Sequence, residues 1–560
     1  MSLAHRSPLT PSDRLRTLAA FVSVLALVVG CQGAAATSSP TASGSPAASA
    51  PPSASGTTET QAPPSASGTT ETQAPPSASG TTETQAPPSG SPPPAASSRP
   101  VAWQWEPAGR MTIGRAYPEA VLLADGRVLV VGNDEASGGS GAVRDDSAAA
   151  DLWDPTTGLW RAAASLNRPR ASFAAAPLLD GRALVTGGLD RGAPAADASP
   201  DDVCYGSGRS QSYSSTYVYD PRSGNDGWSR VGLLGTARTA PAAAVLPDGR
   251  VLVAGGYYED DTAGGAGAFP DGVLAAYHPS SATPTGPHRG PVADVAPSFI
   301  VPALATAELF DPETDTWSAT GSLRYARLGA AAVTLADGRV LVVGSGPYVW
   351  VSRGNDFGAV AAHDRAYISA EIYDPRTGRF SLTGDLPVDR RGDSESGATG
   401  TLVALADGGA LLVGNERSWK HEGSETSSFR FDAQTGRWTE VGQTFVVTLD
   451  PETDRWSTTP GVRRLDALVA RLPDGRVLVA GGDEFQQGEP TVTRSAELYD
   501  PTTNTWSPLP PMPAARAGGA AVALPDGSVL LLGGYDNPDM SAACDEPLGL
   551  ASAVRFVPVP

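Results

Sequence analysis

The sequence predicts an all-β fold made of seven repeated sheets, and three observations lead to this prediction. The string LPDGRVLVAGG occurs at 246–256 and returns unchanged at 472–482. Near copies begin at Leu123, Leu178, Leu335, Leu405 and Leu524. A second string, of the type AELFDPETDTW, follows most copies. Repeats at intervals of tens of residues indicate a repeat architecture, so each repeat is expected to form one structural unit.

The first string of each repeat predicts a hairpin of two strands. In residues 239–256 an apolar run leads into Pro-Asp-Gly and continues as RVLVAGG. Asp-Gly between two apolar runs is a strong signal for a tight hairpin turn. Valine and leucine follow one another here instead of alternating with polar residues, which predicts a strand covered on both faces.

The second string predicts two further strands. Asp-Pro favours a turn because Asp accepts a backbone N–H and Pro presets the next dihedral angle. An aromatic residue precedes every Asp-Pro except the one at 450–451, and a second aromatic, usually Trp, follows the turn. Four antiparallel strands in each unit predict a single β-propeller of seven blades. Residues 429–438 and 448–456 contain two outer-strand strings without an Asp-Gly hairpin between them, so eight blades is the alternative.

The two ends of the propeller are expected to meet in one blade. The last repeat contains a candidate third strand at 553–557 but no fourth. The segment WEPAGRM at 105–111 is similar to WSPLPPM at 506–512, which is a candidate fourth strand. We therefore expect residues 102–111 to complete the last blade.

The repeats resemble those of kelch proteins. The double glycine that closes the second strand in that family occurs four times, at 187–188, 255–256, 481–482 and 533–534, and a single glycine occurs at Gly132, Gly344 and Gly414. The aromatic before the third turn and the Trp in the fourth strand also match. The resemblance covers residues 101–560 and implies a propeller fold. It implies no particular activity, because propellers carry many functions.

The segment before the propeller predicts export and attachment to a membrane. Arg14 and Arg16 precede an apolar run at 18–29, and Gly30-Cys31 follows. This pattern is typical of a signal peptide over 1–30, and LVVGC resembles a bacterial lipobox in which Cys31 receives lipid. Residues 31–98 are rich in Ser, Thr, Pro and Ala and contain three copies of APPSASGTTETQ, which predicts a disordered tether. Residues 99–560 form the predicted propeller, which would stand on the outer face of the cell membrane.

One face of the propeller is expected to carry the binding site. The long insertions, at 189–214, 257–304, 345–369 and 535–550, all connect a second strand to a third, so they share a face. Loops on a rigid scaffold commonly bind ligands. Ten residues before the turn aspartate, six of the seven repeats have arginine: Arg115, Arg170, Arg238, Arg327, Arg464 and Arg516. Two interpretations stay open, namely ion pairs with the neighbouring blade and a ring that binds an anionic ligand.

Cysteine and histidine add little chemistry. Cys204 and Cys544 both lie in insertions on this face, and in an exported protein they are candidates for a disulfide. Some kelch propellers are copper oxidases, but the histidines at 278, 288, 363 and 421 do not have ligand spacing. We assign no catalytic residue, metal or cofactor from the sequence.

The predicted function is recognition of an unknown surface protein or glycan. The formal net charge of −20 argues against nucleic acid as the partner, since binding phosphates requires a basic surface. The protein is expected to be a monomer. The alternative is an exported propeller enzyme that acts on carbohydrate, of oxidase or sialidase type, which pocketed acids or a metal site would favour.

Overall fold

The computed structural model describes part of the chain, beginning at Ala102. The predicted signal peptide 1–30 and tether 31–98 lie outside the described residues. The described ranges are 102–132, 148–191, 210–223, 227–258, 297–300, 303–345, 348–353, 356–361, 369–386, 400–416, 426–441, 445–450, 455–460, 464, 466–486, 489–536 and 549–559. None of the described segments forms a helix of the length and apolarity needed to cross a membrane.

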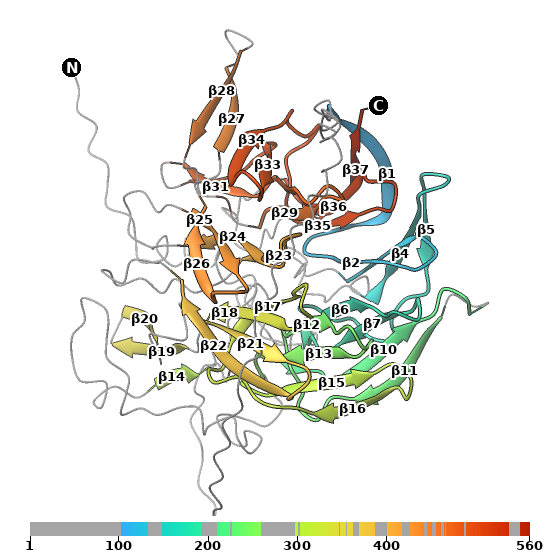
Figure 1. Cartoon of the computed structure of the whole chain (residues 1–560). Coiled ribbons are helices and arrows are strands. Elements are labelled where there is room, and N and C mark those ends of the chain that lie inside the picture. The colour runs from blue at the N-terminus through green and yellow to red at the C-terminus, as the bar shows by residue number, and fades with distance from the viewer. Residues whose placement is uncertain are drawn as a thin grey trace, which may run out of the picture. The chain divides into compact units, whose positions relative to one another are not determined.

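Seven four-stranded antiparallel sheets form the blades (Figure 1). Blade one contains β2 (Glu119–Leu122), β3 (Val128–Val131), β4 (Ala150–Asp154) and β5 (Leu159–Ala163). Blade two contains β6 (Ala174–Pro177), β7 (Ala183–Thr186), β10 (Ser215–Tyr219) and β11 (Trp228–Leu233). Blade three contains β12 (Ala242–Val245), β13 (Val251–Ala254), β15 (Ala307–Asp311) and β16 (Thr316–Ala319). Blade four contains β17 (Leu328–Thr334), β18 (Val340–Ser345), β21 (Ser369–Asp374) and β22 (Arg379–Asp385).

The remaining blades follow the same order of strands. Blade five contains β23 (Thr401–Ala404), β24 (Ala410–Glu416), β25 (Thr426–Asp432) and β26 (Arg437–Glu440). Blade six contains β29 (Leu468–Arg471), β30 (Val477–Ala480), β33 (Ala496–Asp500) and β34 (Thr505–Pro508). Blade seven contains β35 (Ala517–Ala523), β36 (Val529–Tyr535), β37 (Leu550–Pro558) and, as its outer strand, β1 (Trp103–Arg115). The prediction of a seven-bladed all-β propeller is therefore confirmed.

The first strand of every blade lies at the centre of the ring. Neighbouring first strands contact each other in the closed cycle β2, β6, β12, β17, β23, β29, β35 and back to β2. The second strands are fully buried runs of Val, Leu and Ala between the blades, as β3, β13 and β30 illustrate. The continuous apolar pattern of the sequence thus corresponds to strands that neighbouring sheets cover on both faces.

Strand β1 closes the ring in the way that the sequence predicts. It pairs with β37, with Trp105 opposite Phe556. The Trp105 indole N–H donates a hydrogen bond of 2.7 Å to the Pro510 carbonyl, so the N-terminal strand also contacts the segment that follows blade six. Blade seven therefore combines strands from both ends of the propeller.

The extra pair of outer-strand strings does not form an eighth blade. The first string is β25 and β26 of blade five, and the second forms a separate two-stranded hairpin of β27 (Phe445–Asp450) and β28 (Arg455–Pro460). A blade needs an inner pair of strands, which this hairpin lacks. The eight-bladed alternative is therefore wrong.

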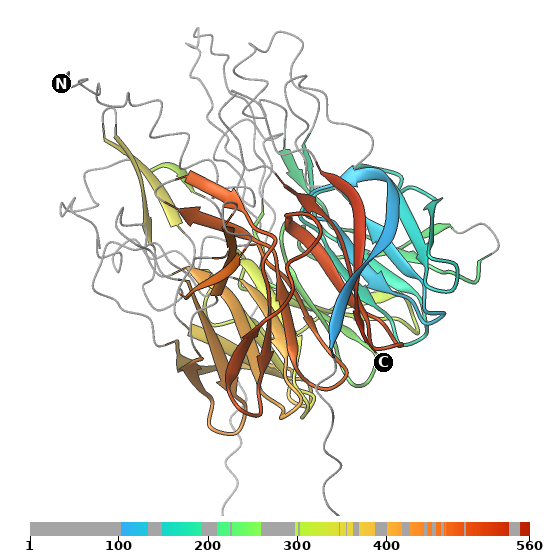
Figure 2. The same cartoon turned by 90° about the horizontal axis from the view of Figure 1, so that it is seen from above.

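Three small accessory sheets lie in connections between second and third strands. They are β8 (Leu189–Arg191) with β9 (Ser210–Ser212), β14 (Pro297–Ile300) with β19 (Tyr348–Arg353) and β20 (Asp356–Ala361), and β31 (Asp483–Gln486) with β32 (Glu489–Val492). We call the face on which second strands end the decorated face (Figure 2). The opposite face carries the Asp-Gly turns, such as the one in which Arg250 is paired with Asp248.

Aromatic pairs join the outer two strands in every blade. In blade three Phe310 lies 5.2 Å from Trp317, and in blade six Tyr499 lies 5.0 Å from Trp506, measured between ring centroids. The Trp506 indole N–H also donates to the Val441 carbonyl of blade five. The Trp of the second string therefore packs within its own blade and is hydrogen bonded to the preceding one.

Candidate functional site

The six arginines of the repeats are buried at the start of the inner strands. Each exposes at most 1% of its surface. In blade three, Arg238 donates to the carbonyls of Gly255 and Thr306 at 3.0 Å and forms an ion pair of 2.7 Å with Glu308. The other blades repeat this geometry, because the guanidinium reaches the glycine seventeen residues further on in blades one, two, four and seven as well.

Within the described residues, four of the six arginines pair with an acid, which comes from the third strand. Asp151, Glu308, Glu371 and Glu497 pair with Arg115, Arg238, Arg327 and Arg464 respectively. Arg170 instead lies 4.9 Å from the ring centres of Tyr213 and Tyr217, and Arg516 donates to the Ser552 carbonyl and hydroxyl. Burial lowers the pKa of Arg516 to about 10, so it stays charged at neutral pH.

The arginine main chain joins each blade to the preceding one. The N–H of Gly188, the second glycine of its pair, donates to the Arg238 carbonyl at 2.9 Å, and Gly256 and Gly482 do the same to Arg327 and Arg516. These contacts agree with the first interpretation of the arginines, in which they hold the blades together. They differ from the expectation in one respect. The guanidinium bonds within its own blade, and the carbonyl bonds to the neighbour. Binding of an anion by the six arginines stays a prediction, and an anion would have to replace these contacts.

The residue two positions after each arginine stands at the mouth of the central channel on the decorated face. We call these six residues the rim positions, and they are Tyr117, Ser172, Ala240, Gly329, Asp466 and Gly518. Their φ angles lie between 46° and 58°, a left-handed conformation that is uncommon outside glycine. Main-chain hydrogen bonds join rim positions of adjacent blades, from Ala240 to Ser172, from Tyr117 to Gly518 and from Gly518 to Asp466. The same backbone geometry therefore recurs around the channel, while the residue type varies, with glycine at two of the six positions.

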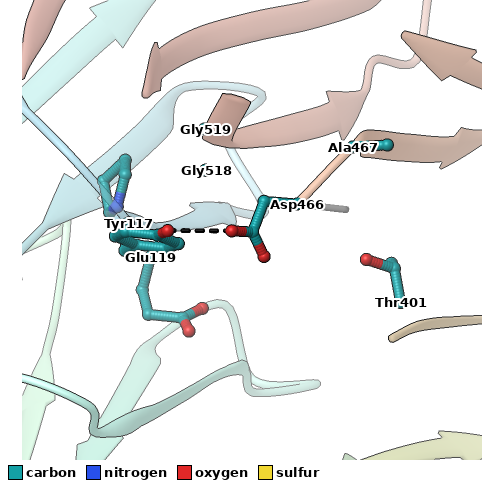
Figure 3. A pocket seen from close by; sticks show the side chains of 8 residues that line it. Tyr117, Glu119, Thr401, Asp466, Ala467, Gly518 and Gly519 are labelled. Carbon is teal, nitrogen blue, oxygen red and sulfur yellow. Dashed lines mark hydrogen bonds between the residues drawn. The ribbon is translucent and has the colours of Figure 1, made fainter. Parts of the chain in front are cut away.

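A hollow of about 200 Å³ opens on the side of the rim where the polar side chains lie. Its lining comes from blades one, five, six and seven and comprises Tyr117, Pro118, Glu119, Thr401, Asp466, Ala467, Gly518 and Gly519. Figure 3 shows the oxygen atoms of Glu119, Thr401 and Asp466 directed into the same opening. This rim pocket is our candidate functional site.

Two tyrosines and two aspartates form a hydrogen-bonded network at one wall of the pocket. The Tyr117 hydroxyl donates to Asp466 Oδ2 at 2.8 Å, and the Tyr535 hydroxyl donates to Asp483 Oδ2 at 2.5 Å. The two tyrosine rings lie 5.7 Å apart, and a Cβ at Gly518 would come within 2.8 Å of both. Gly518 is therefore required for the tyrosines to meet beside Asp466.

Burial shifts the pKa values of this network upward. Asp466 is exposed at the channel mouth, but the protein around its carboxyl reduces its solvation and raises its pKa, and hydrogen bonds from Tyr117 and Tyr535 partly oppose the shift. Burial and the negative charge of Asp466 raise the pKa of Tyr117 well above its ordinary value. Burial and the charge of Asp466 also raise the pKa of Tyr535. The tyrosines therefore remain protonated at neutral pH and act as hydrogen-bond donors.

Glu119 is the most distinctive titratable group of the pocket. Its side chain keeps contact with water through the channel, but the surrounding protein removes much of its solvation and raises its pKa to about 7. None of the ion pairs between described residues includes Glu119 or Asp466. A carboxyl with this pKa changes its charge near neutral pH, so it is suited to binding a cation or transferring a proton.

Other predicted site residues cannot be placed. Cys31, Cys204, Cys544 and the histidines at 278, 288, 363 and 421 lie outside the described residues. Lipidation of Cys31 and the Cys204–Cys544 disulfide stay predictions. Within the described ranges, no group of three or more His, Cys, Asp or Glu side chains is arranged to hold a metal ion.

The rim pocket has no signature among the repeated strings of the sequence. Tyr117, Glu119 and Asp466 belong to no shared string, and Tyr535 directly follows the last double glycine. Tyr117 and Asp466 could have been found from their spacing to the repeated arginine. Counting two residues forward from Arg115 and Arg464 reaches a tyrosine and an aspartate, whereas the same count in blades two to four reaches small residues.

The comparison with protein families supports the fold. The model of the Kelch motif matches residues 470–513, which run from β29 through β34 of blade six. The chain is a kelch-repeat β-propeller. This propeller is 24% identical over 222 residues to Kelch-like protein 25 of Xenopus tropicalis, and the match covers 40% of the chain but only 30% of that relative.

Two solved structures are also similar to the kelch propeller. One is a novel fungal alcohol oxidase in complex with copper, with a TM-score of 0.48 and 16% identity, covering 82% of this chain and 76% of that one. The other is YjhT, with a TM-score of 0.40 and 14% identity, covering 79% of this chain and 95% of that one.

Proposed function

We propose that this kelch propeller is a recognition module that binds a protein partner through its decorated face. The observation that carries the proposal is the difference between the two faces. The accessory sheets and the rim pocket lie on the decorated face, whereas the opposite face consists of tight turns whose Asp and Arg side chains are paired with each other. Irregular additions to one side of a rigid scaffold are typical of binding surfaces.

Site-specific photo-crosslinking tests which face is used. A photoreactive residue replaces Thr491 of β32 on the decorated face, or Asp248 in a turn on the opposite face, in the full chain expressed in its own cells. Both positions are exposed in the structure. We expect a discrete adduct from position 491 and none from 248. Adducts from position 248 alone, or equally from both, would contradict the proposal.

We further propose that the module works at the cell surface, attached through lipid on Cys31 and held by the tether of residues 31–98. The lipobox-like LVVGC string and the repeated low-complexity segment support this proposal. The full chain should be found in the membrane fraction and take up labelled fatty acid. Cys31→Ser should abolish the label, and a label that persists in this variant would exclude Cys31 as the acceptor.

A second function, acid–base catalysis on carbohydrate, is favoured by one feature of the rim pocket. Glu119 has a pKa of about 7, Asp466 is a second carboxyl, and general acids commonly have pKa values near the working pH. Turnover of neutral glycosides that Glu119→Gln abolishes would support an enzyme. Equal turnover by the wild type and this variant would exclude Glu119 as its acid.

A further inference from the structure

The charges at the channel mouth are not balanced among the described residues. Glu119 and Asp466 both line the rim pocket, and no arginine among the described ion pairs reaches either of them. The groups that contact the Asp466 carboxylate are neutral: the Tyr117 hydroxyl donates to it at 2.8 Å, and the Tyr535 hydroxyl, whose shorter bond goes to Asp483, lies 3.4 Å away. A carboxylate with reduced solvation is stabilised when an opposite charge approaches it.

The arginines nearest to the pocket are directed away from it. Arg115 and Arg464 each stand two residues before a rim position, yet both guanidinium groups are buried in ion pairs with Asp151 and Glu497. Their charge is therefore compensated inside the blades, and the guanidinium of Arg516, which has no acid among these pairs, is held by main-chain carbonyls of blade seven. The electrostatic character of the mouth depends on the carboxyls that face it, which is opposite to the anion-binding interpretation of the arginines.

The shape and the wall of the pocket also favour a cation. Tyr117 forms one side of the hollow, and an aromatic ring attracts ammonium and guanidinium groups through its face. Glu119 points into the opening with no hydrogen bond to a described residue, and loss of solvation raises its pKa. An unpaired carboxylate in such a place is stabilised by a ligand that supplies the missing positive charge.

We propose that the rim pocket binds the cationic side chain of a lysine or arginine in a partner protein, between the carboxyls of Glu119 and Asp466. This inference rests on the proposed function, because it specifies the chemistry by which the decorated face recognises its partner. An extended basic segment entering the channel mouth would place its side chain against Tyr117.

Calorimetric titration of the full chain with blocked tripeptides tests the proposal. At pH 8 and physiological salt we expect trilysine to bind, and trinorleucine and triglutamate to bind at least about tenfold more weakly, since one lost ion pair in a partly desolvated site has about this effect. Glu119→Gln should weaken trilysine binding by a similar factor. Glu313→Gln removes the same charge from an exposed turn of blade three and should leave binding unchanged.

Three outcomes would overturn the proposal. These are stronger binding of triglutamate than of trilysine, equal binding of trilysine and trinorleucine, and equal losses in the Glu119 and Glu313 variants, which would indicate a diffuse effect of net charge. The peptide comparison uses the wild type and does not depend on the folding of a variant. If trilysine fails while position 491 still gives its adduct, the cation inference is wrong and the proposed function stands.

Discussion

At the scale of single residues, the buried arginines act as junctions between three strands and two blades. Arg238 lies just before β12, donates through its guanidinium to the carbonyls that flank β13 and β15, and accepts a hydrogen bond from Gly188 of blade two. A planar group with five donors suits such a junction better than lysine, which has a single charged point. Blade five lacks both members of the pair, since Gly397 and Phe429 occupy the two positions. Blade five thus lacks both the arginine and its acid, whereas blades two and seven keep the arginine, which there contacts tyrosine rings or a serine.

The first prediction concerns this ion pair. Arg238→Ala should destabilise the fold by about 3–5 kcal/mol, because it leaves the Glu308 carboxylate buried without its cation. Urea unfolding followed by tryptophan fluorescence measures the change. Adding Glu308→Gln should recover part of the loss, since the amide carries no charge and its one oxygen can still accept the N–H of Gly235, although the N–H of Thr236 then loses its acceptor. A double variant as unstable as the single one would show that charge burial is not the cause.

The second prediction concerns Glu119 and pH. Its folded-state pKa of about 7 lies above its ordinary value of 4.5. It therefore contributes stability that is fully present below the ordinary pKa and is lost as the pH rises through about 7. Glu119→Gln cannot ionise, so it should melt at a higher temperature than the wild type at pH 8.

The difference between the two proteins should narrow as the pH falls toward 5. Asp466 and Tyr117, the other titratable groups that line the pocket, are present in both proteins, so their own titration largely cancels in the comparison. Glu313→Gln, at an exposed turn, should show no such trend between pH 5 and 8. A constant difference at all pH values would contradict the raised pKa.

At the scale of elements, the double glycines are explained by how closely neighbouring blades approach. Gly481 has a φ of +67°, and a Cβ there would lie 2.0 Å from the Arg516 carbonyl of the next blade. A Cβ at Gly187 would likewise come too close to the Arg238 carbonyl, and one at Gly533 to the Arg115 carbonyl. The glycine pair at the end of a second strand is thus needed for contact between blades as well as for its own backbone angle.

The third prediction separates these two roles of glycine. Gly436 has nearly the same φ, +66°, but open space around its missing Cβ. Gly436→Ala should cost about 1 kcal/mol, the strain of a left-handed residue. Gly481→Ala should cost at least about 2 kcal/mol more, because the methyl group forces two blades apart. Chemical unfolding of both variants measures this, and equal losses would mean that φ alone selects the glycine.

The sequence predicted the elements well and the site poorly, for one physical reason. Strands and turns depend on features that every blade needs, such as the Asp-Gly turn, which occurs seven times, and the aromatic residue of the fourth strand, which is Trp in six blades and Phe380 in blade four. The rim pocket depends on Tyr117, Glu119 and Asp466, which occur once each at positions where the blades differ. The arginines were identified, but their acids one strand away were not, since that pairing appears only after the third strand is aligned with the first.

At the scale of the whole molecule, stability depends on the strand that joins the two ends. Every other blade consists of strands from one continuous stretch, whereas blade seven requires β1 from the opposite end of the propeller. Trp105 packs on Phe556 at 4.7 Å and donates to the Pro510 carbonyl. Release of β1 would open the ring between blades seven and one.

The fourth prediction follows from this closure. Trp105→Ala should destabilise the protein by about 3 kcal/mol, the low end for loss of a large aromatic, because Trp105 is half-buried. Trp228→Ala removes an equivalent contact inside blade two, where Trp228 packs on Tyr219 and donates to Ala164. Stopped-flow unfolding should accelerate more for Trp105→Ala than for Trp228→Ala. Equal unfolding rates would show that ring opening does not limit unfolding.

The rim has a consequence for how such a protein can diversify. Its hydrogen bonds run through main-chain N–H and carbonyl groups, as between Tyr117 and Gly518, so the side chain at each rim position is not needed for the frame. Except at Gly518, where a Cβ would meet both tyrosine rings, a substitution there changes what the channel mouth presents while leaving the blades and their contacts in place. Ligand preference can therefore evolve one blade at a time, and descendants of a common propeller gene are expected to differ most at the other five positions.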